Sequence, residues 1–208
     1  MNAAELMTII NTRRSVRKFL AEAVPRADVE KIIEAGRWAP SGANAQNWFF
    51  LAIYSAAVKE KMAAAIRSRV EGYARNITSP RARREFMAYS NFYMFFTDAP
   101  VVIAVVKKPY VSLNLRIMDR YNIPLENRSS SDVQGPAAAV ENMLLMAHAM
   151  GYGACWMTGP LIARKELEEA LVVEPQDELM ALIPLGKPAV APGPSARKDL
   201  SEVYRIIE

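Results

Sequence analysis

The sequence predicts an α+β fold in which a mixed β-sheet is sandwiched by helices. Segments with helical spacing of apolar residues alternate with short continuous apolar runs that are typical of buried strands. Some connections between them are too irregular for a plain doubly wound sheet. The chain has 208 residues, of which 51% are hydrophobic and 23% charged, which is enough for a substantial core. We therefore expect residues 1–208 to form a single domain.

Helical periodicity predicts several amphipathic helices. The second of them directs Val29 and Ile32 inward and is expected to end at Gly36. Pro136 falls early in the helix 132–150 and should strain it, because proline removes a backbone N–H. The predicted helices are 3–11, 26–36, 56–70, one that follows a loop within 71–90, 132–150 and 163–171.

Four apolar runs predict the strands of the sheet. The run 48–54 is apolar on both faces, so we expect it to be a central strand. Residues 107–130 contain Pro109 and Pro124 and are expected to be irregular, and the proline-rich tail 187–208 is expected to extend over a surface. The predicted strands are 48–54, 100–106, 154–157 and 179–185.

Composition excludes several classes of protein. The apolar content and a formal charge of only +4 argue against a disordered chain. Cys155 and His148 are single residues of their types, which excludes an internal disulfide and argues against a zinc site. Residues 1–11 lack the basic start of a signal peptide, and the uncharged run 142–163 is interrupted by polar residues, glycine and proline. We expect a cytoplasmic protein without a membrane segment.

A basic segment near the N-terminus is the first candidate site. Arg13, Arg14, Arg17 and Lys18 carry four positive charges without an acid between them, and Ser15 adds a hydroxyl donor. An anionic group such as phosphate would offset their repulsion, since arginine donates two parallel hydrogen bonds to it. A solvated basic edge is the alternative interpretation.

Three further segments carry unusual residues. The loop 40–47 combines glycine with Asn and Gln side chains that could bind a ligand, although an ordinary loop has the same composition. The segment 156–160 follows a predicted strand, where main-chain N–H groups often face ligands, or forms a simple turn. Arg197 and Lys198 form a basic pair in the tail that could equally be solvated.

Other chemistry is absent from the sequence. It contains no G-x-G-x-x-G after a strand, no phosphate-binding P-loop and no G-x-S-x-G elbow. His148 lies in an apolar run and Cys155 between Ala154 and Trp156, so we expect both to be structural. The residues therefore offer little for acid–base or nucleophilic catalysis.

Taken together, the four segments resemble the nitroreductase family, the FMN-dependent dimeric NAD(P)H oxidoreductases. The order is R-R-S-x-R at 13–17, A-P-S-G-x-N-x-Q-x-W at 39–48, G-x-G-x-x-W at 151–156 and a basic pair at 197–198. The resemblance covers residues 6–204. It implies a mixed sheet flanked by helices, completed by a homodimer with two FMN sites at its interface.

The resemblance also implies residue roles. Arg13, Ser15, Arg197 and Lys198 would hold the FMN phosphate with Arg14 beside them, and Arg17 would lie near the pyrimidine end of the flavin. The loop from Pro40 to Asn44 would reach the flavin of the partner subunit, and 157–159 would lie under the ring with a main-chain N–H facing N5. The implied cofactor-binding residues are Arg13, Arg14, Ser15, Arg17, Pro40, Ser41, Gly42, Asn44, Met157, Thr158, Gly159, Arg197 and Lys198.

The implied reaction is a ping-pong reduction, in which NADH or NADPH reduces flavin N5 and a small electron-poor acceptor, such as a nitroaromatic or a quinone, is then reduced. The cofactor carries this chemistry, so no catalytic residue and no metal are expected. The family also includes enzymes that dehalogenate iodotyrosine, dehydrogenate peptide-derived substrates or cleave reduced flavin. Asn47 stands where many members have proline, and Trp156 where some have proline. A large ring at 156 could change which acceptors fit.

One alternative comes from a different class. The segment 67–84 holds six arginines and one acid, so a nucleic-acid-binding protein is conceivable, although no recognised nucleic-acid motif accompanies the segment. Aromatic residues follow it at 86, 89, 92, 93 and 96; their spacing fits either a helical core or a substrate site.

Overall fold

A four-stranded sheet organises the fold. The computed structural model describes residues 2–124 and 130–208. Its strands lie in the order β1-β2-β4-β3, and each neighbouring pair is antiparallel. Among the described residues, one parallel contact joins the sheet, an isolated bridge between Ser15 and Ala154. The strands are β1 (Trp48–Ile53), β2 (Val101–Lys107), β3 (Gly153–Ala154) and β4 (Glu178–Gly186).

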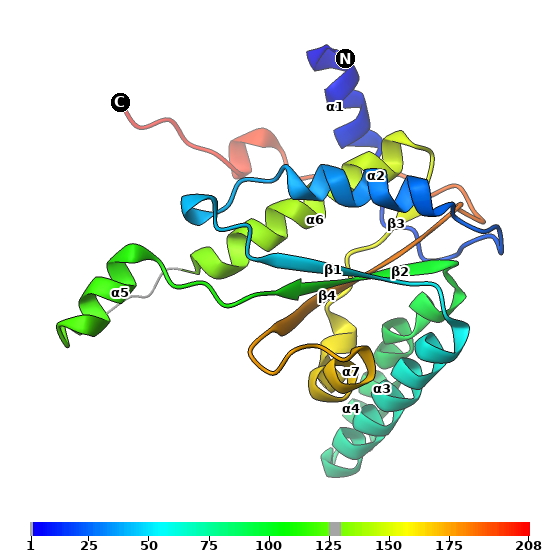
Figure 1. Ribbon diagram of the computed structural model, residues 1–208. Helices are drawn as coiled ribbons and strands as arrows, with labels where there is room; N and C mark the ends of the chain where they lie inside the picture. The colour runs from blue at the N-terminus through cyan, green and yellow to red at the C-terminus, as the bar shows by residue number, and fades with distance from the viewer. Residues whose placement is uncertain (1, 125–129) are drawn as a thin grey trace.

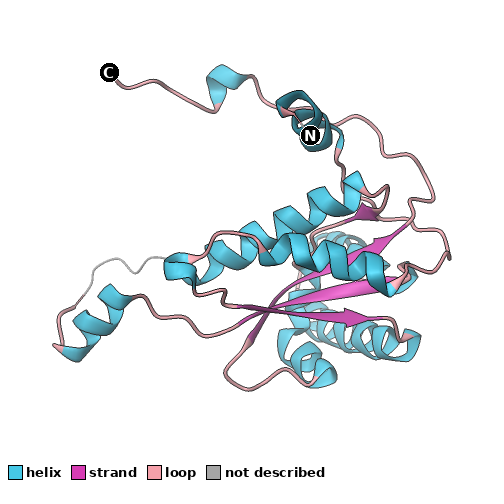
Figure 2. Ribbon diagram, turned by 45° about the horizontal axis from the view of Figure 1, so that its top comes forward, coloured by secondary structure: helices cyan, strands magenta, loops and turns pink. Residues whose placement is uncertain are grey.

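Helices cover both faces of this sheet, which confirms the predicted α+β sandwich (Figures 1 and 2). The odd-numbered residues 101–105 of β2 pack toward α2 and α6, and the even-numbered residues 102–106 pack toward α3 and α7. Both faces of β2 are therefore buried, which explains its continuous apolar run. The helices are α1 (Ala3–Thr12), α2 (Arg26–Arg37), α3 (Ala56–Asn76), α4 (Pro80–Ser90), α5 (Leu113–Arg120), α6 (Ser131–Ala149) and α7 (Arg164–Leu171).

The prediction that 48–54 is a central strand is wrong. β1 pairs only with β2 and lies at the edge of the sheet formed by the described residues. The side chain of Phe49 is 50% exposed. An apolar residue on the outer face of an edge strand has the same sequence pattern as one in a central strand, so the composition of the strand could not separate the two.

The prediction that Gly36 ends its helix is wrong. It lies inside α2, where it is buried against α6. A Cβ atom on Gly36 would lie 2.8 Å from Cγ of Met143. The glycine therefore permits the close approach of two helix backbones, and α2 continues for one more residue to Arg37.

The region 107–130 is more regular than predicted, because it contains the helix α5. Ser112 caps this helix by accepting the N–H of Leu115 at 3.3 Å. α5 stands away from the sheet (Figure 1) and leaves Leu113 and Ile117 exposed. Residues 125–129 of the same region lie outside the described residues. α3 also extends beyond its predicted end at 70, to Asn76.

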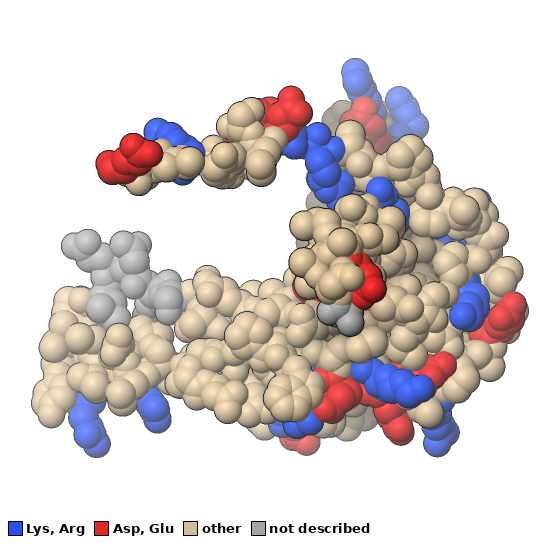
Figure 3. Space-filling model, turned by 90° about the horizontal axis from the view of Figure 1, so that it is seen from above, with Lys and Arg blue, Asp and Glu red and all other residues tan. Residues whose placement is uncertain are grey.

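The two ends of the chain lie on the same side of the sheet (Figure 1). The tail from 191 onward is exposed and stands off the body, as Figure 3 shows, rather than lying over a surface. Within the described residues, no helix has the length and apolarity needed to span a membrane.

Candidate functional site

The basic N-terminal segment is fixed to the edge of the sheet. The backbone N–H of Val16 donates to the carbonyl of Ala154 at 3.0 Å. Val16 is buried against Gly153, where a Cβ atom would lie only 2.6 Å from Val16 Cγ2. Because side chains alternate along an extended chain, Ser15 and Arg17 point to the side opposite Val16.

This segment and the tail enclose a cleft of about 490 Å³. The cleft brings together residues from the two ends of the chain, and Figure 3 shows basic side chains where the tail joins the body. Lys198 is not among the residues that line it. The lining residues are Arg13, Arg14, Ser15, Arg17, Pro192, Gly193, Pro194, Ser195 and Arg197.

The cleft keeps a positive charge. Arg13 pairs with Glu141 at 3.3 Å. Arg14 donates to the carbonyls of Asn11 and Arg13, each at 2.7 Å, and Arg197 donates to the Ser195 hydroxyl at 2.6 Å. These neutral acceptors do not cancel a guanidinium charge.

Two donor atoms of the lining residues have no partner in the part of the chain that the structure describes. The Nε atoms of Arg13 and Arg14 are buried and make no hydrogen bond within the described residues. The four arginines that line the cleft give it the charge for an anionic group.

A second, smaller cavity of about 170 Å³ adjoins the first. Arg17 lines both cavities, so they meet at its side chain. The floor of the second cavity is the segment 155–160. Its walls are aromatic: Tyr89, Phe92, Tyr93, Phe95 and Trp156.

The segment 155–160 is held by β4 on one side and by an aromatic ring on the other. Met157 exchanges two backbone hydrogen bonds with Leu182, at 2.9 and 3.0 Å. A Cβ atom on Gly159 would lie 2.3 Å from Cδ1 of Tyr93, so only glycine allows this ring to approach. Burial, aided by the neighbouring Tyr89, raises the pKa of Tyr93 and keeps its hydroxyl protonated.

Cys155 is buried and His148 is half-buried. Burial raises the pKa of the Cys155 thiol, although Arg17 and Ser15 oppose the shift, so the group that lines the smaller cavity is a thiol. His148 lies 2.8 Å from the Thr12 hydroxyl through Nε2. Burial and the nearby Arg13 and Arg14 lower its pKa, which favours the neutral imidazole.

The loop 40–47 lies apart from both cavities. Its Gly42 packs against Tyr110, to whose hydroxyl a Cβ would be 3.0 Å distant. Ser41 lies next to Gly135 in the first turns of α6. None of Pro40, Ser41, Gly42 or Asn44 lines the two cavities of the same chain. Their predicted role at the cofactor therefore requires a second subunit.

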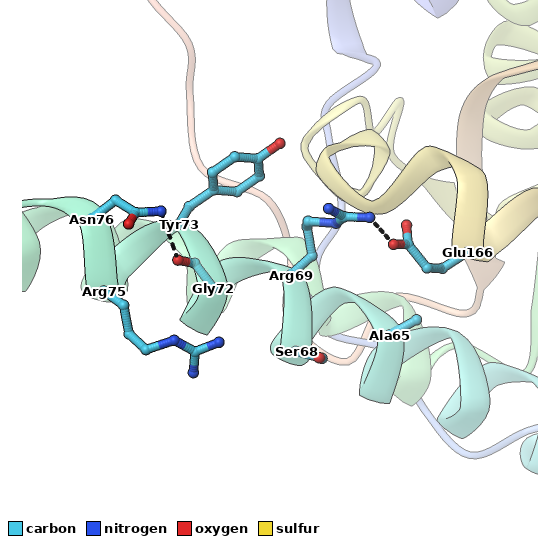
Figure 4. A pocket seen from close by; sticks show the side chains of 8 residues that line it. All are labelled: Ala65, Ser68, Arg69, Gly72, Tyr73, Arg75, Asn76 and Glu166. Carbon is cyan, nitrogen blue, oxygen red and sulfur yellow. Dashed lines mark hydrogen bonds and ion pairs between the residues drawn. The ribbon is translucent and has the colours of Figure 1, made fainter.

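Three of the six arginines in the segment 67–84 form ion pairs with acidic residues. Arg67 pairs with Glu60 and Arg81 with Glu85. In the cavity of about 440 Å³ beside α3, Arg69 points to Glu166, while Arg75 lies on the same helix nearby (Figure 4). These ion pairs weaken the case for a nucleic-acid surface.

The aromatic residues for which the sequence left a core role and a site role open divide between the two. Phe86 and Phe96 pack in the core, as helical spacing suggested, but Tyr89 and Phe92 are 64% and 59% exposed and line the smaller cavity. Large aromatic residues beside an arginine-rich segment were the sequence feature that pointed to these walls. No sequence feature pointed to the tail residues 192–195 as part of the site, because proline, glycine and serine are common in loops.

The sequence model named "Nitroreductase family" matches residues 10–187. The chain belongs to the nitroreductase family. It is an oxidoreductase of that family. It is 29% identical over 205 residues to a protein of Methanothermobacter thermautotrophicus that is provisionally named NADH dehydrogenase/NAD(P)H nitroreductase. The alignment covers 97% of this chain and 85% of that protein. It is 26% identical to the iodotyrosine deiodinase of Danio rerio over 205 residues, which cover 96% of this chain and 66% of that protein.

Solved structures agree with this family assignment. A BluB-like flavoprotein from Clostridium difficile superposes with a TM-score of 0.89 at 29% identity, covering 98% of this nitroreductase-family chain and 99% of the other. A Desulfovibrio desulfuricans protein in complex with FMN gives 0.71 at 29% identity, with 100% and 98% covered. The relatives of this nitroreductase-family enzyme therefore carry more than one activity.

Proposed function

We propose that this nitroreductase-family enzyme binds FMN and uses NADH or NADPH to reduce electron-poor acceptors such as nitroaromatics and quinones. The observation that carries the proposal is Arg17, which lines both the cationic cleft and the aromatic cavity. A ligand with an anionic group at one end and a flat ring at the other matches this pair of cavities. FMN has this composition, and a relative that is 29% identical binds it.

The cationic cleft suits the phosphate end. Arg13 and Arg14 offer guanidinium charges, Ser15 offers a hydroxyl, and Arg197 approaches from the tail. A phosphate dianion would satisfy these groups together, since charge-assisted hydrogen bonds are the strong ones. Lys198 lies outside the lining residues, so we assign it no direct contact.

The smaller cavity suits the ring end. Bound FMN would supply the hydride chemistry itself, so this chain needs no acid, base or nucleophile of its own. Met157, Thr158 and Gly159 line this cavity and would present the main chain to the ring. Arg17 would stabilise negative charge at the adjoining end and so favour reduction.

A homodimer is the second part of the proposal. The tail exposes several large apolar side chains that the chain itself does not cover, and the loop 40–44 lies away from the cavities of its own subunit. Association of two copies would bury the former and could bring the latter to the partner's cofactor. The exposed tail residues are Leu200, Val203, Tyr204, Ile206 and Ile207.

Light scattering checks the homodimer. The purified protein is expected to have twice the 23.2 kDa mass of the chain. A monomer with a full complement of FMN would contradict the assignment of the loop 40–44 to a partner's site.

A different FMN reaction of the family is the second candidate. The similarity to the BluB-like flavoprotein, at a TM-score of 0.89, exceeds that to the D. desulfuricans FMN complex at 0.71. One relative is a deiodinase. Dehalogenation, dehydrogenation or cleavage of reduced flavin would use the same cavities with a different occupant of the aromatic walls.

An absorption spectrum with anaerobic addition of NADH or NADPH separates these candidates. The purified protein is expected to show a flavin spectrum that bleaches when the nucleotide is added and returns when a quinone follows. A flavin that stays oxidised with both nucleotides would favour the second candidate. A colourless protein that rejects added FMN would overturn both.

A further inference from the structure

The loop between Pro40 and β1 has a strained backbone. Ala43, Asn44 and Gln46 have φ angles of 49°, 54° and 47°, in the left-handed region that residues other than glycine rarely adopt. Two side-chain bonds lie inside the loop: the backbone N–H of Gln46 donates to the Ser41 hydroxyl at 2.9 Å, and the Gln46 side-chain amide donates to the Asn44 carbonyl at 3.5 Å. Such a conformation persists only where the surroundings hold it, so the anchoring of this loop needs a physical cause.

Proline in the neighbouring helix creates an unpaired carbonyl. Pro136 lies inside α6, and the carbonyl four residues earlier, that of Asp132, cannot receive the usual helical N–H from it. The side chain of Asn47 supplies the missing donor, with Nδ2 2.7 Å from the Asp132 carbonyl oxygen. Asn47 is only 4% exposed, so water does not readily replace it.

The surroundings fit this contact closely. Gly135 lies against Ser41 and Asn47, and a Cβ atom there would be 3.1 Å from Ser41 Cβ and 3.4 Å from Asn47 Oδ1. The carbonyl of Asn47 accepts the N–H of Lys108 at 3.0 Å. Asp132 is held a second time, by Lys107 through its carboxylate at 2.7 Å. The end of the loop, the start of α6 and the adjoining strands thus meet around one amide.

The side-chain amide of Asn47 also costs desolvation free energy, because one of its atoms is buried without a partner in the described part of the chain. Asn47 Oδ1 is buried and has no hydrogen-bond partner among the described residues. An apolar side chain would avoid that penalty but could donate nothing to Asp132. The donation of Asn47 to the carbonyl that Pro136 leaves free offsets the penalty.

We propose that Asn47 is a positioning residue for the cofactor. Its side chain replaces the N–H that Pro136 lacks and thereby fixes the loop 40–47 to α6 in its strained conformation. Through that loop it sets the places of Ser41, Gly42 and Asn44. This inference rests on the proposed function, in which these residues contact the FMN of the partner subunit.

A double-mutant cycle tests the proposal. Asn47→Ala is expected to raise the Kd for FMN about tenfold, equivalent to about 1.4 kcal/mol, and to lower the melting temperature of the FMN-free protein. Pro136→Ala restores a backbone N–H to the Asp132 carbonyl. In the double variant it should therefore recover part of the lost melting temperature but not the FMN affinity, because the loop 40–47 still lacks its side-chain bond to α6. Fluorescence titration with FMN and thermal unfolding measure the two quantities.

Asn142→Ala is the matched control. The side chain of Asn142 makes a similar bond from α6, to the carbonyl of Ala35 at 3.1 Å, but has no link to the loop. It should lower the melting temperature and leave the Kd for FMN unchanged. If Asn47→Ala does not fold, Asn47→Asp, which lacks the N–H donor but keeps the shape, takes its place in the cycle.

The outcomes separate this inference from the proposed function. A wild-type Kd in Asn47→Ala, or recovery of the FMN affinity on adding Pro136→Ala, would overturn the positioning role while FMN binding by the wild type stands. If the wild type binds no FMN, the proposed function and the positioning role fall together. The melting temperatures would then show whether the bond from Asn47 to the Asp132 carbonyl stabilises the fold without any role in cofactor binding.

Discussion

Replacing Arg13 and Arg197 together by alanine is expected to weaken FMN binding by about 10²–10⁴-fold. Each arginine would contribute a charge-assisted hydrogen bond, of about 1.5–3 kcal/mol, to the phosphate. Removal of Arg13 also leaves the carboxylate of Glu141 without its ion-pair partner at 3.3 Å, so the cleft gains a repulsive charge. Titration of the FMN-free variant with FMN, followed by flavin fluorescence, measures the change in Kd.

Two controls show whether the loss is local. Lys198→Ala removes an equal charge next to Arg197 but outside the cleft lining, and Arg81→Ala removes an exposed arginine paired with Glu85 on α4. Both should leave the Kd near its wild-type value. Full retention of FMN by the Arg13/Arg197 variant would refute the placement of the phosphate, and an equal loss in Lys198→Ala would show that only the general charge of the tail matters.

Substituting Gly153 by alanine is expected to damage both stability and cofactor binding. The new Cβ would lie 2.6–2.7 Å from three atoms of Val16, which is closer than packed carbon atoms tolerate. Val16 and the segment 13–17 would have to move away from β3. Overpacking of this kind typically lowers the free energy of unfolding by about 1–3 kcal/mol. Because Ser15 and Arg17 move with the segment, FMN affinity should fall as well; denaturant unfolding and FMN titration measure the two effects.

Two further variants test whether the loss of stability in Gly153→Ala comes from the contact with Val16. Val16→Ala in the Gly153→Ala background should restore only part of the stability, because Val16 Cβ itself lies 2.7 Å from the added atom. Gly72→Ala meets its nearest atom at 3.7 Å in the middle of α3, so it should stabilise the protein, by up to about 1 kcal/mol. An equally stable and fully FMN-binding Gly153→Ala variant would show that the segment 13–17 yields freely.

Local patterns predicted most of the fold. The positions of the four strands and of the main helices follow from apolar spacing, because burial of one face determines both. The place of a strand in the sheet does not follow from spacing: β1 has the composition of an inner strand but pairs only with β2. Gly36 was misread for a similar reason, since its packing against Met143 depends on another helix.

The candidate site was predictable where charge revealed it. Four cations between residues 13 and 18 indicated an anion site, and the cleft places three of them together with Arg197. The aromatic walls were harder to predict, because Tyr89 and Phe92 have the same spacing as the buried Phe96. The role of Pro40 to Asn44 was predicted only through the family resemblance, and one chain does not test it, because these residues line neither cavity of their own subunit.

The cleft has one wall that is rigid and one that is not. The segment 13–17 is bonded to the sheet, whereas residues 192–197 belong to an exposed tail with few contacts of its own. A phosphate bound by both walls would hold the tail against the body. This ordering costs conformational entropy, which part of the binding free energy must offset. The affinity for FMN then reflects the contacts with the cofactor minus the cost of ordering the tail. Any change that holds the tail against the body before FMN binds should therefore tighten binding without adding a contact to the cofactor.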